Sequence, residues 1–288
     1  MYFTDHILAA SLLPKRNFDS SKGSFGRAAL IVGSEKYPGA AMLALESALR
    51  GGAGYVNYIG TKSLCSRLQL RSPEALYSEL DYTIDAERER LVSITSSANS
   101  ILIGSGCEST RSLYLAVSKL LSIEGAPLVL DADAINAIAE FGDLDIIANA
   151  RRRVILTPHP LEFSRLTGLS VAEIQSSRAS IASSFAARCG CILVLKGAGT
   201  VTTDGEVTYV NSSGSSALAK AGSGDVLSGL LTSLLAFSND PLRTAALAVY
   251  IHGRAGDNLS AELSDFGVTP SDLPIECARV IASLQKEK

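Results

Sequence analysis

The sequence predicts a doubly wound α/β/α sandwich with a mostly parallel central sheet, and three observations support this fold class. Short apolar runs rich in β-branched residues alternate with longer amphipathic stretches, as strands and crossover helices do. The runs are almost continuously apolar, which is typical of parallel strands covered on both faces. Asp204-Gly205 separates two β-prone runs, which predicts a hairpin and therefore an antiparallel edge. The six expected strands are Ala28–Val32, Tyr55–Ile59, Ser100–Ile103, Leu128–Leu130, Val154–Leu156 and Ile192–Leu195.

Helices are expected in the segments between these strands and throughout the C-terminal part of the chain. Two segments between strands have the length and the Ala/Leu content of crossover helices, namely 39–50 and 111–121. After Ser223 the apolar periodicity, interrupted at Asn239-Asp240-Pro241 and Thr269-Pro270, predicts three more helices. These span 225–236, 242–263 and 273–286.

Length and composition indicate one folded domain over residues 1–288, with residues 1–20 as an N-terminal extension that could be mobile. The net charge of -3, from 26 basic and 29 acidic residues, provides no basic surface for nucleic acid or an anionic membrane. No apolar run is long enough to cross a bilayer, and Asp5 and His6 stand where a secretory signal has a basic head. We therefore expect a cytoplasmic protein. Its five scattered cysteines, without a CxxC pair, indicate reduced thiols and no zinc site.

The segments that directly follow the expected strands are rich in glycine and small polar residues. In a doubly wound sheet, ligands bind beyond the carboxyl ends of the strands, and glycine lets backbone N–H groups point into such a cavity. Several such turns together favour a ligand with more than one phosphate, although glycine also serves simply to turn the chain. No Walker A motif is present, and no GxGxxG follows the first strand. The segments are 33–35, 104–106, 131–133, 157–160 and 196–200.

The strongest single motif is a glycine-rich turn that leads into an apolar-periodic helix, Ala221-Gly222-Ser223-Gly224-Asp225-Val226-Leu227. The N–H groups of Gly222, Ser223 and Gly224 are expected to form an anion hole at the helix N-terminus. Asp225, in the first turn, is expected to be ionised by the helix dipole and to act as the catalytic base for a substrate hydroxyl. The alternative, in which Asp225 only caps the helix, is less favoured because of the two glycines.

This motif, AGSGDVLSG, resembles the Gly-x-Gly-Asp signature of ribokinase-like kinases. Four further segments, GRAALIVGSEKYPGAAMLALESALRGGAGYV, LDADAINAIA, ILTPHPLEFSRLTG and LVLKGAGTVTTDG, are similar in sequence and order to those of the NAD(P)H-hydrate dehydratases. The resemblance covers about residues 20 to 285 and implies a ribokinase-like three-layer sandwich. One loop departs from it: the family usually has Gly-Pro-Gly-Leu-Gly where this chain has Gly104-Ser105-Gly106-Cys107-Glu108, which keeps two glycines and adds a charge.

The resemblance implies a role for individual residues of this chain. Asp225 would be the catalytic base and would contact the hydrated nicotinamide, while Gly224 and the preceding turn would surround the nucleotide phosphates. The hydrate would also contact Ala41 (or its neighbour Ala40), Gly106 and His159. Since His159 lies between two prolines, its rigid backbone suits such a contact, although a turn histidine bonded to the main chain is the alternative. Further nucleotide contacts would come from Lys196, Gly197, Ala198, Gly199, Thr200 and Asn136.

The resemblance also implies an activity and its co-substrates. Members of this family return the S-epimer of hydrated NADH or NADPH (NADHX or NADPHX) to NAD(P)H, a carbon–oxygen lyase reaction that repairs the nucleotide. The reaction uses ADP or ATP with Mg²⁺, and the sequence assigns no metal ligands. A homo-oligomer, a tetramer by family expectation, is implied, and an NAD(P)HX epimerase would be a separate pathway partner.

Two other functions are compatible with the sequence. The first is a small-molecule kinase of the same superfamily, acting on a hydroxyethylthiazole, a hydroxymethylpyrimidine or a sugar; the TPHP and KGAGT segments argue against it. The second is a non-catalytic nucleotide-binding regulator, against which the intact turn at Gly222 to Asp225 argues.

Overall fold

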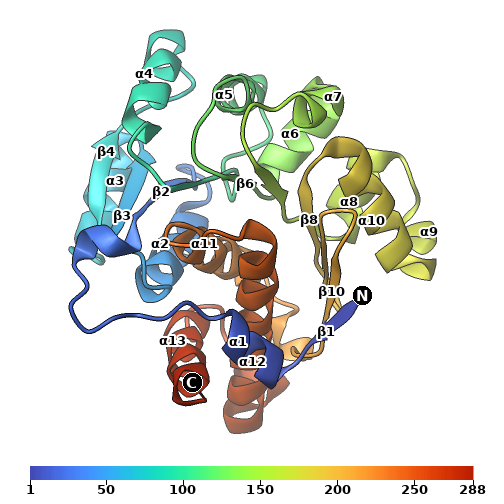
Figure 1. Cartoon of the computed structure of the whole chain (residues 1–288). Coiled ribbons are helices and arrows are strands. Elements are labelled where there is room, and N and C mark those ends of the chain that lie inside the picture. Colours follow the sequence, from blue (N-terminus) through green and yellow to red (C-terminus); the bar gives the residue numbers. More distant parts are fainter. Residues whose placement is uncertain (288) are drawn as a thin grey trace.

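A computed structural model describes residues 1–287 of the chain, and Figure 1 shows their arrangement. Ten strands form one sheet in the order β1-β10-β9-β8-β7-β6-β5-β2-β3-β4. The predicted α/β/α fold class is confirmed, and four of the six predicted strands have the predicted bounds. The strands are β1 (Tyr2–Thr4), β2 (Arg27–Ile31), β3 (Tyr55–Gly60), β4 (Leu76–Glu79), β5 (Ser100–Ile103), β6 (Leu128–Leu130), β7 (Val154–Leu156), β8 (Ile192–Leu195), β9 (Val201–Thr203) and β10 (Thr208–Asn211).

The sheet is parallel from β4 to β8 and changes direction at β9. Strand β9 is antiparallel to both β8 and β10, so the predicted antiparallel pair is present. The amides of Glu206 and Val207 donate to Asp204 Oδ1 at 3.0 and 2.8 Å, and Gly205 has a φ of +99°. The Asp-Gly pair therefore forms the turn, because its aspartate bonds the following backbone and its glycine takes the left-handed conformation.

The first twenty residues contribute a strand and a helix to the fold. Strand β1 pairs in parallel with β10, and helix α1 follows it, capped by Asp5, which accepts from the amide of Leu8 at 2.8 Å. Ala9 is fully buried on the helix α12 side. Within the segment expected to extend from the core, Tyr2–Thr4 thus form one edge of the sheet and His6–Leu12 form a helix.

Helices cover both faces of the sheet. The longest, α12, turns at Ser264, where φ is +66°. Within residues 1–287 no helix is both long and apolar enough to cross a membrane. The helices are α1 (His6–Leu12), α2 (Pro38–Arg50), α3 (Lys62–Gln69), α4 (Asp85–Thr95), α5 (Arg111–Leu121), α6 (Asp133–Phe141), α7 (Asp145–Ala148), α8 (Pro160–Thr167), α9 (Val171–Ser176), α10 (Arg178–Cys189), α11 (Ser223–Leu235), α12 (Pro241–Gly267) and α13 (Leu273–Lys286), with 3₁₀ turns at Lys22–Phe25 and Ser216–Leu218.

Alternate residues of the central strands enter two separate hydrophobic cores. In β2, Ala28 and Leu30 join the core beneath α1, α2, α3, α11, α12 and α13, whereas Ala29 and Ile31 join the core beneath α4 to α10. Successive side chains of a strand point to opposite faces. A strand covered on both faces is therefore apolar at every position, which is the pattern that made these strands recognisable.

Candidate functional site

The carboxyl ends of four neighbouring strands are joined by one hydrogen-bond network. Ser105 follows β5, Asp131 follows β6, Thr157 follows β7 and Lys196 follows β8. Asp131 Oδ1 accepts from Thr157 Oγ1 at 2.7 Å and from Lys196 Nζ at 2.9 Å. Its other oxygen, Oδ2, accepts from Ser105 Oγ at 2.8 Å. Because parallel strands end at the same edge of the sheet, residues far apart in the sequence meet here.

The network holds charged groups away from water. Asp131 is 1% exposed, and burial opposes its ionisation, but the ammonium of Lys196 and the two hydroxyls outweigh burial and hold its pKa below the usual value. Burial likewise opposes the charge of Lys196, while Asp131 and Glu162 raise its pKa. Burial raises the pKa of Glu162, whose Oε2 lies 3.9 Å from Lys196 Nζ, to about 7. Lys196 therefore remains a cation, and Asp131 holds its ammonium group in place.

The glycine turn before α11 lies directly opposite this lysine. Gly222 has a φ of +104°, and a Cβ there would lie 2.6 Å from Leu43, so only glycine fits the turn. The amide of Ser223 donates to the carbonyl of Lys220 at 3.2 Å, but those of Gly222, Gly224 and Asp225 have no acceptor within residues 1–287. Three free amides, and not that of Ser223, are thus available to an anion at the positive end of α11.

Asp225 is less acidic than the sequence led us to expect. Burial, together with repulsion from Asp131, raises the pKa of Asp225 to about 7, although Lys196 opposes this effect. Removal from water therefore opposes the ionisation that the helix dipole was expected to favour. A carboxyl group with a pKa near neutrality can both accept and release a proton, which suits general base catalysis.

Three cavities meet at this turn. The Val249 cavity, of about 470 Å³, is partly apolar and is also lined by Leu227 and His252; the central cavity, of about 480 Å³, is lined by Asp131, Lys196 and His159. The Tyr37 cavity, of about 460 Å³, is lined by Lys36, Gly106 and Asp133. Gly224 lines the first two cavities, and Asp225 lines the central and Tyr37 cavities. The glycine turn therefore borders all three cavities, with the central cavity between the other two.

His159 both caps a helix and borders the central cavity. Its Nδ1 accepts from the amides of Leu161 and Glu162 at 3.1 and 3.2 Å, which leaves the proton on Nε2. Burial and the nearby Lys196 and Arg165 lower the pKa of His159. His159 is therefore a neutral side chain that is hydrogen-bonded to the main chain, which was one of the two interpretations of the sequence. Its position at the central cavity still allows a ligand contact.

Most of the residues singled out by sequence lie around these cavities. Gly197 lines the Val249 and central cavities, Ala198 and Thr200 line the Val249 cavity, and Gly106 lines the Tyr37 cavity. Gly199 lies in the same loop but lines none of the three.

Two candidate residues lie elsewhere. Ala41 is fully buried in the core, while its neighbour Ala40 lines the Tyr37 cavity, because adjacent helical residues point about 100° apart. Asn136 lies one turn further along α6 than Asp133, in a separate cavity where its Oδ1 accepts from Arg165. It lines none of the three cavities around the turn.

Sequence reasoning named the loops but not the network that organises them. Asp131, Thr157 and Ser105 belong to segments noted for their small polar residues, yet none was identified as a functional residue. Each stands within two residues after a buried strand, and that position was the available signal. Ala132 next to Asp131 has a φ of +46°, an uncommon conformation for a residue with a Cβ.

A divalent cation at this site would need ligand atoms from a bound nucleotide as well as from the protein. Within the described residues 1–287, no group of three or more His, Cys, Asp or Glu side chains could hold a metal ion. Mg²⁺, however, is commonly bound by one or two carboxylates with substrate phosphates and water. The residues present therefore fit a Mg²⁺ ion that arrives with phosphate groups, and not a metal caged by protein alone.

The sheet order, the glycine turn at α11 and the lysine–carboxylate network define a ribokinase-like α/β protein. A family model described as NAD(P)H-hydrate dehydratase matches residues 28–278. The chain is 35% identical over 255 residues to an ADP-dependent (S)-NAD(P)H-hydrate dehydratase of Bacillus subtilis, covering 88% of this chain and 87% of that protein. The chain belongs to the NAD(P)H-hydrate dehydratase family.

Two further similarities agree with this assignment. A crystal structure of an ADP/ATP-dependent NAD(P)H-hydrate dehydratase from B. subtilis, co-crystallized with ATP/Mg²⁺, matches with a TM-score of 0.87 and 32% identity over 98% of each chain. A bifunctional NAD(P)H-hydrate repair enzyme of Thermofilum pendens is 34% identical over 96% of this chain and 53% of its own length. The chain spans about half the length of such bifunctional relatives.

Proposed function

We propose that this protein uses ADP or ATP to dehydrate the S-epimer of NADHX or NADPHX to NADH or NADPH, a lyase reaction that repairs the nucleotide. The observation that carries this proposal is the position of Asp225. Its carboxyl group lines both the central and the Tyr37 cavity, beside three free amides and opposite Lys196. A base is thus placed between a volume for phosphates and a volume for a second substrate.

In the proposed assignment the nucleotide occupies the Val249 and central cavities, and the hydrated nicotinamide occupies the Tyr37 cavity. The partly apolar lining at Leu227 and Val249 suits a base. Lys196 and the amides of the glycine turn suit the terminal phosphate, where negative charge accumulates during phosphoryl transfer. Gly106 lines the Tyr37 cavity and His159 lines the central cavity. Both residues remain candidates for contact with the hydrate.

The reaction follows from these positions. Asp225 accepts the proton of the hydrate hydroxyl, and the oxygen takes up the terminal phosphoryl group, leaving AMP from ADP or ADP from ATP. The C–O bond then breaks with loss of phosphate, and the adjacent ring carbon releases a proton, which restores the dihydronicotinamide. Mg²⁺ held by nucleotide phosphates would offset the transferring charge.

A small-molecule kinase would share the first half of this reaction and would release a phosphorylated product. The family match favours dehydration over that alternative. Because the enzyme is proposed to act on the S-epimer, a separate NAD(P)HX epimerase is its expected pathway partner. A homo-oligomer, with a tetramer as the family expectation, is testable by light scattering.

The role of Asp225 is tested with the Asp225→Asn variant. The amide keeps the shape of the side chain but cannot accept the hydroxyl proton, so we expect nucleotide binding to persist and turnover to fall by about a hundredfold or more. Calorimetry with ADP and with ATP measures binding, and the return of NADH absorbance measures turnover. Near wild-type turnover of NADHX by the variant would show that Asp225 is not the base.

A further inference from the structure

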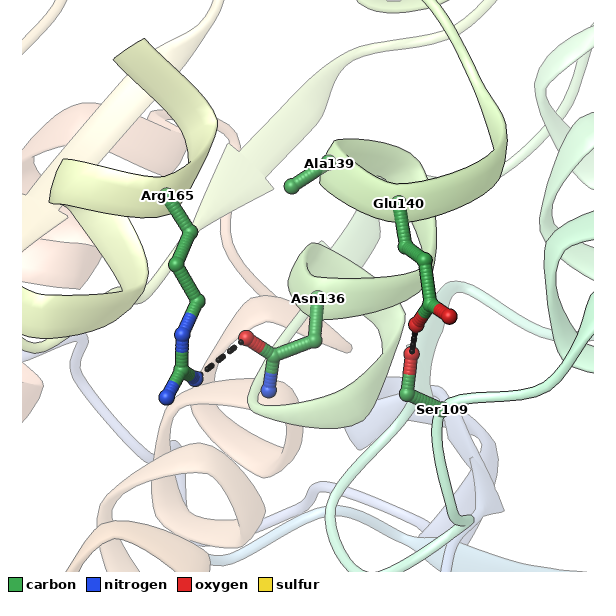
Figure 2. Close-up of a pocket in the computed structure, with 5 residues that line it drawn as sticks. All are labelled: Ser109, Asn136, Ala139, Glu140 and Arg165. Carbon is green, nitrogen blue, oxygen red and sulfur yellow. Dashed lines mark hydrogen bonds between the residues drawn. The ribbon is translucent and has the colours of Figure 1, made fainter. Parts of the chain in front are cut away.

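A fourth cavity lies beside the proposed active site. It has a volume of about 460 Å³ and is formed where the loop before α5 approaches helices α6 and α8. Figure 2 shows two polar pairs on its walls: an Arg165 guanidinium nitrogen donates to Asn136 Oδ1 at 2.9 Å, and Ser109 Oγ donates to Glu140 Oε2 at 3.0 Å. We call it the Arg165 cavity; its fifth lining residue is Ala139.

Both helices that form this cavity also reach the proposed active site. On α6, Asp133 lines the Tyr37 cavity and lies one turn before Asn136, with which it interacts. On α8, the cap residue His159 lines the central cavity, and Arg165 follows six residues later, about 9 Å along the helix axis. The Arg165 cavity is therefore within reach of an extended ligand held at Asp225.

The charges in this cavity suit a ribose phosphate. Arg165 is exposed, its one side-chain hydrogen-bond partner within residues 1–287 is the neutral amide of Asn136, and it forms no salt bridge there, although its charge lowers the pKa of Glu162. A guanidinium in this state binds phosphate oxygens through charge-assisted hydrogen bonds. On the opposite wall in Figure 2, the carboxylate of Glu140 can accept from ribose hydroxyls, as acidic residues of dinucleotide sites do.

The surroundings make this arginine the more distinctive. Carboxyl groups of Asp131, Asp133 and Asp225 line the adjoining cavities, while Lys196 is bound to Asp131. A dinucleotide carries phosphates beyond the ring that reacts, and these favour a nearby cation. Two exposed cations are available: Lys36, which lines the Tyr37 cavity, and Arg165, which lies beyond it on α8.

We infer that the Arg165 cavity binds the ribose-phosphate part of the hydrated dinucleotide that lies away from the nicotinamide, with Arg165 on a phosphate and Glu140 on a ribose hydroxyl. This inference rests on the proposed function, because it assumes that the ring is bound near Asp225. The phosphate is either the pyrophosphate, which NADHX and NADPHX share, or the 2′-phosphate, which only NADPHX carries. In the second case Arg165 determines the preference for NADPHX over NADHX.

The test compares Arg165→Ala and Glu140→Gln with wild type, and Arg153→Ala is the matched control. Arg153 is an exposed arginine directly before β7. It lies at the amino end of that strand, whereas the site lies at the carboxyl ends. KM is measured for NADHX, NADPHX and the nucleotide co-substrate. We expect Arg165→Ala to raise KM for the hydrate about tenfold or more, as loss of a charge-assisted hydrogen bond does, while KM for ADP or ATP stays unchanged.

The two phosphate sources give different results. A rise with both hydrates identifies the pyrophosphate, and a rise with NADPHX alone identifies the 2′-phosphate. Glu140→Gln is expected to raise KM for both hydrates by a smaller factor. Values for Arg165→Ala within twofold of both wild type and Arg153→Ala for both hydrates would overturn the inference.

A second measurement separates this inference from the proposed function. Calorimetric titration with NADH and with NADPH reports dinucleotide binding whether or not the protein turns over the hydrates. If wild type dehydrates neither hydrate, the proposed function fails, but weaker dinucleotide binding by Arg165→Ala would still support the cavity. If wild type, Arg165→Ala and Arg153→Ala bind NADH with the same Kd, and likewise bind NADPH with the same Kd, the proposed role of the Arg165 cavity is excluded.

Discussion

The carboxylate of Asp131 accepts hydrogen bonds from side chains that follow strands β5, β7 and β8, and it is almost completely buried. The Lys196 side chain that it binds is 18% exposed. Burial of two charges is costly unless each satisfies the other. The pair therefore does more to place the ammonium beside the glycine turn than to stabilise the fold.

The two members of this pair should be strongly coupled in stability. We expect Asp131→Ala to lower the free energy of unfolding by about 3 kcal/mol, because Lys196 is left buried without its partner. The double variant Asp131→Ala/Lys196→Met should lose less than the sum of the single variants. Urea denaturation of the four proteins measures this, and additive losses would contradict a buried, mutually dependent pair.

The raised pKa of Asp225 predicts a pH-dependent stability difference between wild type and Asp225→Asn. Since the pKa of Asp225 is about 7 in the folded protein and the ordinary pKa of an aspartate is 3.8, the folded protein holds this proton more tightly than the unfolded chain does. Ionisation therefore destabilises the wild type as pH rises from about 4 to about 7. The asparagine variant should be the more stable protein at pH 8, by about 1 kcal/mol or more.

Thermal and urea unfolding between pH 4 and pH 8 measure this difference. The control is Asp19→Asn, which replaces an exposed aspartate outside the site, and its difference from wild type should not change with pH. A stability advantage of Asp225→Asn that is the same at pH 4 and pH 8 would show that burial does not raise the pKa as described.

Helices α2 and α11 pack more closely than side chains with a Cβ would allow. A Cβ added to Gly229 of α11 would lie 2.1 Å from the carbonyl oxygen of Ala44 in α2. Both helices begin at the proposed site: the first turn of α2 lines the Tyr37 cavity, and α11 begins with the glycine turn. Two helices that both begin at the site are therefore in close contact further along their length.

Two glycine substitutions test this contact. Gly229→Ala should lower the free energy of unfolding by about 1–3 kcal/mol, the range for overpacking a core. Gly39→Ala, in the first turn of α2, has no atom within 4 Å of the new Cβ and should leave stability unchanged or slightly higher. Urea denaturation compares them, and a neutral Gly229→Ala would contradict the close helix contact.

Elements covered on both sides were predictable, and those at the margins were not. Strands β5 to β8 lie in the middle of the sheet and appear as apolar runs. Strand β4, at one edge, has the sequence Leu-Tyr-Ser-Glu with no fully buried residue, so burial left no pattern in it. Strand β1, at the other edge, has one buried residue, Thr4.

At the scale of the molecule, the site was predictable in its location and less so in its individual contacts. The strand ends and the glycine turn meet because parallel strands share one carboxyl edge. The choice between Ala40 and Ala41 depends on the rotation of α2, and the position of Asn136 depends on how far α6 extends from the edge. Neither is encoded in a motif, since both follow from helix packing.

Nucleotide binding should stabilise the whole molecule, because the Val249 and central cavities are built from β8, α11 and α12 together. A ligand that binds only the folded state at about 100 times its Kd adds about 2.7 kcal/mol. We expect ADP or ATP with Mg²⁺ to raise Tm for wild type and for Asp225→Asn alike. No shift in either protein with saturating nucleotide would contradict the assigned nucleotide site.

The most direct measurement incubates the purified protein with NADHX and Mg²⁺, adds ADP or ATP in separate reactions, and follows the return of NADH absorbance with phosphate release. The account predicts NADH and phosphate in equal amounts, with no reaction when nucleotide is omitted. A stable phosphorylated product detected by mass, or no nucleotide-dependent NADH at all, would contradict it.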